Sequence, residues 1–136
     1  MFVLDTNVIS EMRLRTKANP NVMAWTVATP ADQTFLSAIT ILEIEVGVQL
    51  IERKDKRQGQ NLRAWIDGQV LPGFEGRILP VDTAVAQCCA GLHVPKTKAD
   101  RDAMIAATAI VHAMTVVTRN VRDFSGMSVK LLNPWL

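Results

Sequence analysis

Hydrophobic residues gather in short continuous runs that alternate with longer stretches of helical period. The first run covers residues 1–4 and ends at a polar turn, which predicts a buried strand. Further apolar or β-branched runs predict strands at residues 34–37, 77–81, 115–118 and 129–132. Periodicity and capping residues predict helices at residues 6–13, 20–28, 38–52, 62–71, 83–93 and 100–114. This alternation predicts one domain over residues 1–136, of the α/β class with a mostly parallel central sheet.

The helix expected over residues 38–52 carries an acid beside its apolar stripe. The residues that recur at helical spacing, and that are expected to pack against the sheet, are Ile39, Leu42, Val46 and Leu50. Glu43 falls within this stripe, whereas Glu45 falls on a more polar side and is expected to be solvated. A carboxylate that turns inward needs a partner or a metal ion, so Glu43 is a candidate site residue. Residues 52–63 are charged and predict a helix end, a loop and a helix start.

Three further polar residues are candidates for the same site as Glu43. Asp5 and Asn120 each follow a predicted buried strand, and ligands of parallel sheets bind at the carboxyl ends of the strands. Asp102 lies on the rim of an apolar helix face. If the fold brings these residues together, hard oxygen ligands favour Mg²⁺ or Mn²⁺. The alternatives are structural: Asp5 as a helix cap, Asp102 as a first-turn acid behind an N-cap at Asp100, and Asn120 as a turn residue.

Composition narrows the class of protein. The chain has 136 residues, 49% of them hydrophobic, and a formal charge of +2, which is too balanced for binding nucleic acid by bulk charge. Its cysteines, Cys88 and Cys89, are adjacent and indicate reduced thiols of a cytoplasmic protein. There is no secretory signal pattern, and the most apolar helix, at residues 103–114, is too short to span a bilayer. We therefore expect a soluble cytoplasmic protein with no membrane partner.

Other conspicuous residues add little chemistry. His93 and His112 lack the spacing of a zinc site. The tryptophans are too scattered along the sequence to predict a base-stacking platform and are expected in the core or at interfaces; they are Trp25, Trp65 and Trp135.

A set of ordered segments resembles the PIN-domain family of metal-dependent ribonucleases, and within it the toxins of VapC and FitB type. The resemblance covers nearly the whole chain. It rests on FVLDTNVISE at residues 2–11, LSAITILE at 36–43 with Gly47, GRILP at 76–80, DAMIAATA at 102–109, VTRN at 117–120 and LNPW at 132–135. Asp5, Glu43 and Asp102 match the first three acids of the family, while Asn120 stands where the fourth residue is often Asp.

The resemblance implies a PIN-like three-layer α/β/α sandwich, Mg²⁺ or Mn²⁺ held by the acids, and a homodimer. It implies a toxin that cleaves RNA and is silenced by a cognate antitoxin with a DNA-binding domain, so that operator DNA is bound only through the antitoxin. The apolar residues of the helices at 6–13 and 20–28 are expected to receive an antitoxin segment.

We therefore predict an endoribonuclease. Asp5 and Asp102 would bind the metal directly, while Glu43 would bind it through water or take up a proton. The candidates for contact with the RNA phosphates are Arg13, Arg119 and Arg122, with residues 54–63 more distant. Asp123 follows Asn120 by three residues, and Phe124 is expected to anchor that loop in the core and limit where Asp123 points.

Two alternatives remain. In a non-catalytic α/β module, which binds RNA or protein, the acids would only cap helices. A phosphoacceptor receiver domain also has an aspartate at the end of a strand, but it needs a lysine after a late strand, where this chain has Arg119.

Overall fold

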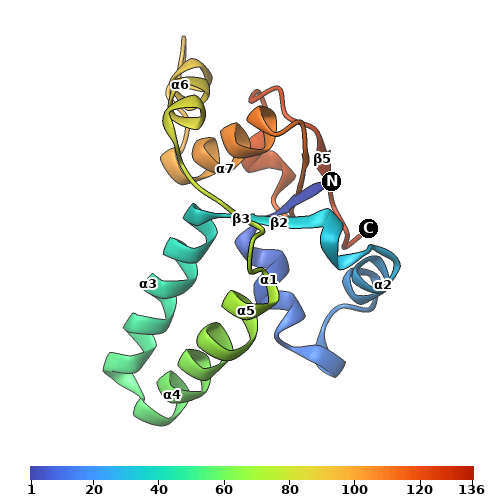
Figure 1. Ribbon diagram of the computed structural model, residues 1–136, viewed down its shortest axis with the longest axis vertical. Coiled ribbons are helices and arrows are strands. Elements are labelled where there is room, and N and C mark those ends of the chain that lie inside the picture. Colours follow the sequence, from blue (N-terminus) through green and yellow to red (C-terminus); the bar gives the residue numbers. More distant parts are fainter.

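A five-stranded sheet, in which every neighbouring pair of strands is parallel, forms the centre of the computed structural model, which describes residues 1–136 (Figure 1). The strands are β1 (Phe2–Leu4), β2 (Thr34–Ser37), β3 (Ile78–Leu79), β4 (Thr115–Val117) and β5 (Leu131–Leu132). Their order across the sheet is β3-β2-β1-β4-β5. The prediction of a mostly parallel sheet is confirmed, and no antiparallel pair is present. The strands β3 and β5 are shorter than the sequence pattern suggests.

Helices cover both faces of the sheet. They are α1 (Thr6–Met12), α2 (Pro20–Ala28), α3 (Ala38–Lys54), α4 (Lys56–Trp65), α5 (Leu71–Gly73), α6 (Thr83–Leu92) and α7 (Asp100–Val111). A π-helical turn, Ile66–Val70, joins α4 to α5. Figure 1 shows α6 and α7 on one side of the sheet and α1, α3, α4 and α5 on the other. The expected three-layer α/β/α sandwich is confirmed, and no helix is both long and apolar enough to cross a membrane.

Side-chain alternation along the strands divides the core in two. Val3 and Val116 point to the face covered by α6 and α7, in a cluster with residues such as Ala106 and Phe124. Leu4 and Val117, one residue further on, point to the opposite face, in a cluster with side chains of α1 and α3. Because the side chains of the same strands are packed on both faces, the strands are held in place. The residue that follows each strand therefore lies at the carboxyl edge of the sheet.

The buried face of α3 differs from the predicted one. The residues that pack inward are Ile39, Thr40, Ile44 and Val48. Leu42, Val46 and Leu50 are instead 44%, 38% and 57% exposed. Both stripes have aliphatic side chains four residues apart, so periodicity alone could not distinguish them. Packing decides, because Ile44 and Val48 meet the apolar side chains of α1 and the π-helical turn.

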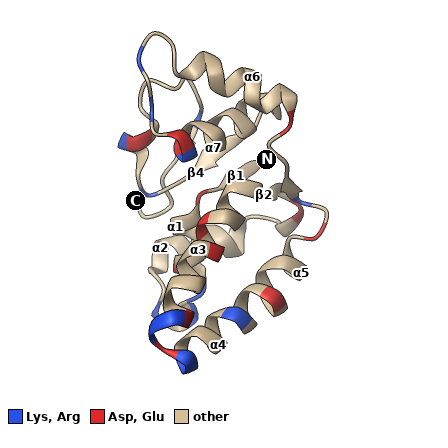
Figure 2. Cartoon of the chain, turned by 90° about the vertical axis from the view of Figure 1, so that its left-hand side faces the viewer, with Lys and Arg blue, Asp and Glu red and all other residues tan.

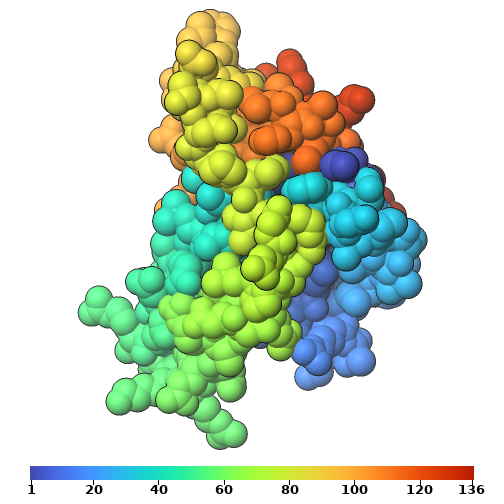
Figure 3. Space-filling model, viewed as in Figure 1, coloured from blue at the N-terminus to red at the C-terminus, as the bar shows by residue number.

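The turn between α3 and α4 is tighter than predicted. Only Asp55 separates the two helices, and its carboxylate accepts a hydrogen bond from the backbone N–H of Gln58 at 3.1 Å. Gly59 permits this approach, because a Cβ there would lie 2.7 Å from the Cα of Glu52. The resulting hairpin projects away from the sheet (Figure 3). The N-cap of α7 also differs: Ala99 holds that position, and Asp100 lies in the first turn with its carboxylate 3.5 Å from His93.

Candidate active site

One open cleft of about 640 Å³ brings together all four of the predicted site residues. Asp5 follows β1 and Asn120 lies two residues beyond Thr118, which follows β4, so both occupy the carboxyl edge of the sheet. Glu43 reaches the cleft from the second turn of α3, and Asp102 reaches it from the first turn of α7. The fold thus places all four residues on one cleft, and their roles there remain a prediction.

Asp5 is the most firmly held of the four. Its side chain is 6% exposed. One carboxylate oxygen accepts a hydrogen bond from the backbone N–H of Thr6 at 2.8 Å, which caps α1. The other accepts from the hydroxyl of Thr118 at 2.8 Å and from the amide of Asn7 at 3.1 Å. Burial raises the pKa of Asp5, and these hydrogen bonds oppose that rise. Asp5 is thus both a helix cap and a cleft residue.

Thr118 organises this edge of the site, although no pattern in the sequence singled it out. Its hydroxyl is fully buried, donates to Asp5, and accepts from the backbone N–H of Asn120 at 3.0 Å and from the amide of Asn7 at 3.3 Å. The Asn7 side-chain oxygen in turn accepts from the backbone N–H of Arg119 at 3.2 Å. This network joins the end of β4 to the start of α1 and fixes the Asp5 carboxylate.

Asp102 and Glu43 line the same cleft from two further helices. Burial, followed by the negative charges of Asp5, Asp123 and Glu43, raises the pKa of Asp102 to about 6. One Glu43 oxygen accepts a hydrogen bond from the hydroxyl of Thr6 at 2.7 Å, and the other lies 4.0 Å from Arg101. The neighbouring negative charges therefore disfavour ionisation of Asp102 unless a cation is bound.

The loop after β4 adds Asp123 to the cleft. Phe124 is 1% exposed and anchors the loop, as expected. The anchored loop nevertheless directs Asp123 toward the site, since Asp123 lines the cleft and its charge raises the pKa of both Asp5 and Asp102. The Asn120 side chain lines the cleft as well and makes no hydrogen bond within the chain.

The basic residues divide into two groups. Arg13 and Arg119 line the cleft, as predicted, whereas Arg122 does not. Arg63 is engaged elsewhere: its guanidinium lies 2.9 Å from Glu45 and 3.1 Å from Glu52. Glu45 is therefore paired rather than freely solvated, and hydrogen bonding to Arg63 lowers its pKa. Figure 2 shows blue basic positions where α3 turns into α4; the exposed residues there are Arg53, Lys54, Lys56 and Arg57.

The donor set fits a hydrated hard cation. The cleft offers carboxylate and amide oxygens, which Mg²⁺ and Mn²⁺ prefer, and neither cysteine nor histidine lines it. No three of the chain's Asp, Glu, His and Cys side chains converge into a complete metal cage. Mg²⁺ does not need one, because it keeps several waters and binds one or two carboxylates together with substrate phosphates.

We expect Asp102→Asn to stabilise the metal-free protein above pH 6. In the folded state the pKa of Asp102 is about 6, compared with 3.8 for an ordinary aspartate carboxyl. The folded protein therefore binds this proton more tightly than the unfolded chain does, and the free energy of unfolding falls as the pH rises between these two values. The substitution should remove this pH-dependent loss and raise the free energy of unfolding by ~1 kcal/mol after allowance for solvent screening. Urea unfolding in EDTA from pH 4 to 8 measures it, with the exposed Asp67→Asn as control. An unchanged pH profile in the Asp102 variant would refute the coupling.

Comparisons with known proteins agree with this geometry. A family model described as PIN domain matches residues 2–129. The chain is 40% identical to Toxin FitB of Neisseria gonorrhoeae over 140 residues, which cover 99% of each protein. It is 37% identical to VapC ribonuclease Y4jK of Sinorhizobium fredii over 142 residues, 99% of this chain and 98% of the relative. The solved structure of FitAB bound to an IR36 DNA fragment superposes with a TM-score of 0.90 at 40% identity, covering 100% of this chain and 96% of that chain.

Proposed function

We propose that this chain, which belongs to the PIN domain family, is the ribonuclease toxin of a toxin–antitoxin pair. The observation that carries the proposal is the cleft in which Asp5, Glu43 and Asp102 meet at the carboxyl edge of the sheet. Relatives named as a toxin and as a ribonuclease, which match 99% of the chain, support the same function. The substrate would be an RNA phosphodiester.

The acids would hold Mg²⁺ or Mn²⁺. Such an ion, when bound, lowers the pKa of a coordinated water and offsets charge on the phosphate oxygens. Asp5 and Asp102 would bind it directly, because both carboxylates line the cleft and the charge of Asp5 is close enough to raise the pKa of Asp102. Asn120 can offer only a neutral oxygen, so we assign it a weaker contact through water. Asp123 is available as a further carboxylate.

The remaining residues would orient the substrate and move a proton. Glu43 has one oxygen fixed by Thr6, which leaves the other able to accept a proton from an attacking water. Arg13 and Arg119 line the same cleft and would contact phosphate oxygens on the two sides of the cut. Thr118 and Asn7 would hold Asp5 in place rather than touch the substrate.

We propose an antitoxin with a DNA-binding domain as the protein partner, and DNA binding only through that partner. The structure of the relative FitAB with a DNA fragment supports this arrangement. On this chain the docking surface would be the apolar hollows around Met12, which also involve Trp25, Met23 and Phe74. The free thiols Cys88 and Cys89 and an RNA substrate are consistent with action in the cytoplasm.

We also propose a homodimer that forms through the exposed stripe of α3. Leu50→Glu should convert the dimer to a monomer, because it places a charge in an apolar surface that also includes Leu42 and Val46. Light scattering of the purified protein measures the mass. Val27→Glu is the control, since Val27 is an 83% exposed aliphatic residue on another helix. An unmodified chain that is already monomeric, or a Leu50 variant that stays dimeric, would contradict this surface.

A non-catalytic binding module explains the site less well. Asp5 does cap α1, as that alternative requires. Capping gives no reason, however, for Glu43 and Asp123 to line the same cleft as Asp102, whose pKa is raised by burial and then by the charges of Asp5, Asp123 and Glu43. Clustered acids of this kind cost stability unless a cation offsets their charge, and they are typical of functional sites.

Controlled expression in a bacterial host tests the toxin function. Expression of the chain should arrest growth, and co-expression of the product of a reading frame that abuts this gene should restore it. The control is the Asp5→Asn variant, which should be harmless at the same protein level. Normal growth with the unmodified chain, at confirmed expression, would contradict the toxin proposal.

A further inference from the structure

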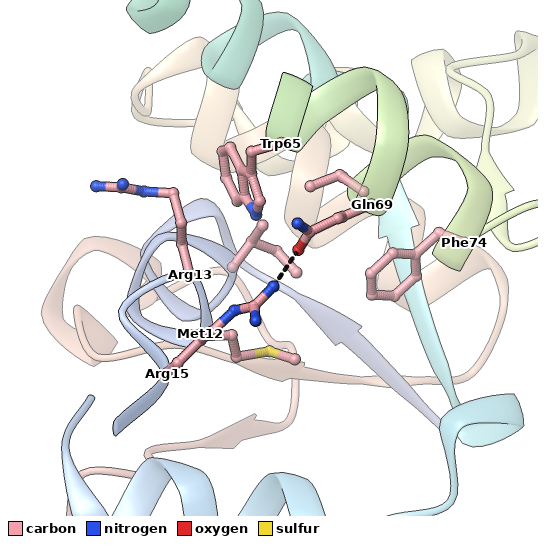
Figure 4. Close-up of a pocket in the computed structure, with 8 residues that line it drawn as sticks. Met12, Arg13, Arg15, Trp65, Gln69 and Phe74 are labelled. Carbon is pink, nitrogen blue, oxygen red and sulfur yellow. Dashed lines mark hydrogen bonds between the residues drawn. The ribbon is translucent and has the colours of Figure 1, made fainter. Parts of the chain in front are cut away.

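Two arginine–tryptophan pairs stand beside the acids. The Arg13 guanidinium carbon lies 5.7 Å from the ring centroid of Trp65, and that of Arg119 lies 5.5 Å from the ring centroid of Trp135. Both distances are within the range of a cation–π contact. Figure 4 shows Arg13, which directly follows α1, near Trp65, the last residue of α4. Residues 13 and 65 are far apart in sequence, as are 119 and 135, so neither pair could be predicted from the sequence.

Both indoles can be reached from the acids. Arg119 and Trp135 line the cleft of Asp5 itself. On the other side, a groove of about 250 Å³ shares Arg13 and Glu43 with that cleft and continues to Trp65. Gly47 lines this groove, and a Cβ built there would meet nothing within 4 Å, so the wall at Gly47 is open.

The two arginines have free hydrogen-bond donors. Neither guanidinium takes part in an ion pair, whereas Arg63 is held by Glu45 and Glu52. Stacking on an indole fixes the plane of a guanidinium and leaves its N–H groups at the edge, in the geometry that matches phosphate oxygens. An anion that enters the cleft would therefore find two oriented and uncommitted cations.

The indoles are held by the fold. The backbone N–H of Trp135 donates to the side chain of Asn133 at 2.9 Å, and its carbonyl accepts from the amide of Asn21 at 2.9 Å. Trp65 ends α4, and the next residue, Ile66, is 1% exposed. Both rings are half-buried against the core cluster that includes Leu4. Each ring thus keeps an accessible part in a fixed position, which favours stacking of a ligand.

We propose that the two pairs grip a single RNA strand on either side of the cut, each indole stacking on a base and each guanidinium contacting a phosphate. This inference rests on the proposed ribonuclease function and adds to it the residues that would hold the RNA on each side of the cut. A base can stack on an indole only when it is unpaired, so the substrate is single-stranded at the cut. Stacking tolerates every base, so sequence preference from these pairs is weak.

Binding of a fluorescein-labelled 12-nucleotide single-stranded RNA of mixed sequence tests the inference. All measurements use the Asp5→Asn background, so that the RNA is not cut. Trp65→Ala and Trp135→Ala should each weaken binding about tenfold, as expected for loss of one stacked base. Trp65→Phe and Trp135→Phe should restore most of the affinity. Val27→Ala, which shortens an 83% exposed side chain outside the cleft, is the control and should leave affinity unchanged once folding is confirmed by thermal unfolding.

An abasic RNA with the same ribose-phosphate backbone separates stacking from a structural effect. The alanine variants should bind it as well as the parent protein does, since no base remains to be stacked. An equal loss for normal and abasic RNA, or no loss for either, overturns the inference, as does a loss confined to binding of the antitoxin. If the chain with intact Asp5 cuts no RNA, the ribonuclease proposal itself fails; if it cuts RNA and the tryptophan variants bind normally, only the stacking proposal fails.

Discussion

Asp5→Asn should lower the rate of RNA cleavage by at least ~100-fold and leave the fold intact, since the charge and the proposed metal ligand are lost together. The asparagine keeps one oxygen and the volume of the side chain. Its oxygen can still accept from the backbone N–H of Thr6, and its amide can donate to the Thr118 hydroxyl instead of accepting from it. Only the bond from the Asn7 amide lacks an acceptor, so most of the network at the end of β4 is retained. Asp102→Asn should have a comparable effect. Single-turnover cleavage of a labelled RNA at saturating protein is the measurement.

The exposed Asp67→Asn serves as the control for a loss of one negative charge, and it should cleave at the rate of the unmodified protein. Thermal unfolding shows whether each variant is folded. Cleavage within a few-fold of normal by both the Asp5 and Asp102 variants, in preparations free of contaminating nuclease, would show that this cleft is not the active site.

Thr118→Val should damage both stability and activity, although Thr118 touches no substrate in our account. Valine has the shape of threonine and removes only the hydroxyl. The buried Asp5 carboxylate then loses a donor at 2.8 Å, and the backbone N–H of Asn120 loses its acceptor. We expect a loss of ~2 kcal/mol in the free energy of unfolding. Activity should fall by roughly 10–100-fold, the usual effect of losing a group that orients a metal ligand.

Thr108→Val is the matched control for Thr118→Val. Thr108 is also fully buried, but its hydroxyl donates to the carbonyl of Met104 within its own helix, away from the cleft. Urea unfolding and the cleavage assay should therefore change little in this variant. If the Thr118 and Thr108 variants lose equal amounts of activity, Thr118 has no positioning role, and the loss comes from altered core packing.

The parts of the site that follow strands could be predicted from the sequence. A run of buried residues shows where a strand ends, and parallel strands end at one edge, so Asp5 and Asn120 had to lie near each other. Asp102 was predictable as the acid at the rim of an alanine-rich face. These inferences use only local pattern and the geometry of parallel sheets.

The parts that depend on long-range packing could not be predicted. Two aliphatic stripes on α3 have the same spacing, and only the neighbouring elements select the one with Ile44. The role of Thr118 depends on a contact with Asp5 across 113 residues of sequence. The pairing of Trp65 with Arg13 depends on how the α3–α4 hairpin folds back beside α1. For the same reason, two tryptophans that are far apart in sequence both lie at the site: Trp135 lines the cleft and Trp65 lines the adjoining groove.

Cleavage of total RNA by the purified chain, before and after removal of divalent metal, tests the central claim most directly. The unmodified chain should cut RNA in Mg²⁺ or Mn²⁺, stop in EDTA, and resume when either metal is restored in excess. The Asp5→Asn variant, purified in the same way, should cut under none of these conditions. RNA cleavage that persists in EDTA, or that is equal in the Asp5→Asn variant, would contradict the assignment of this cleft as a metal-dependent ribonuclease site.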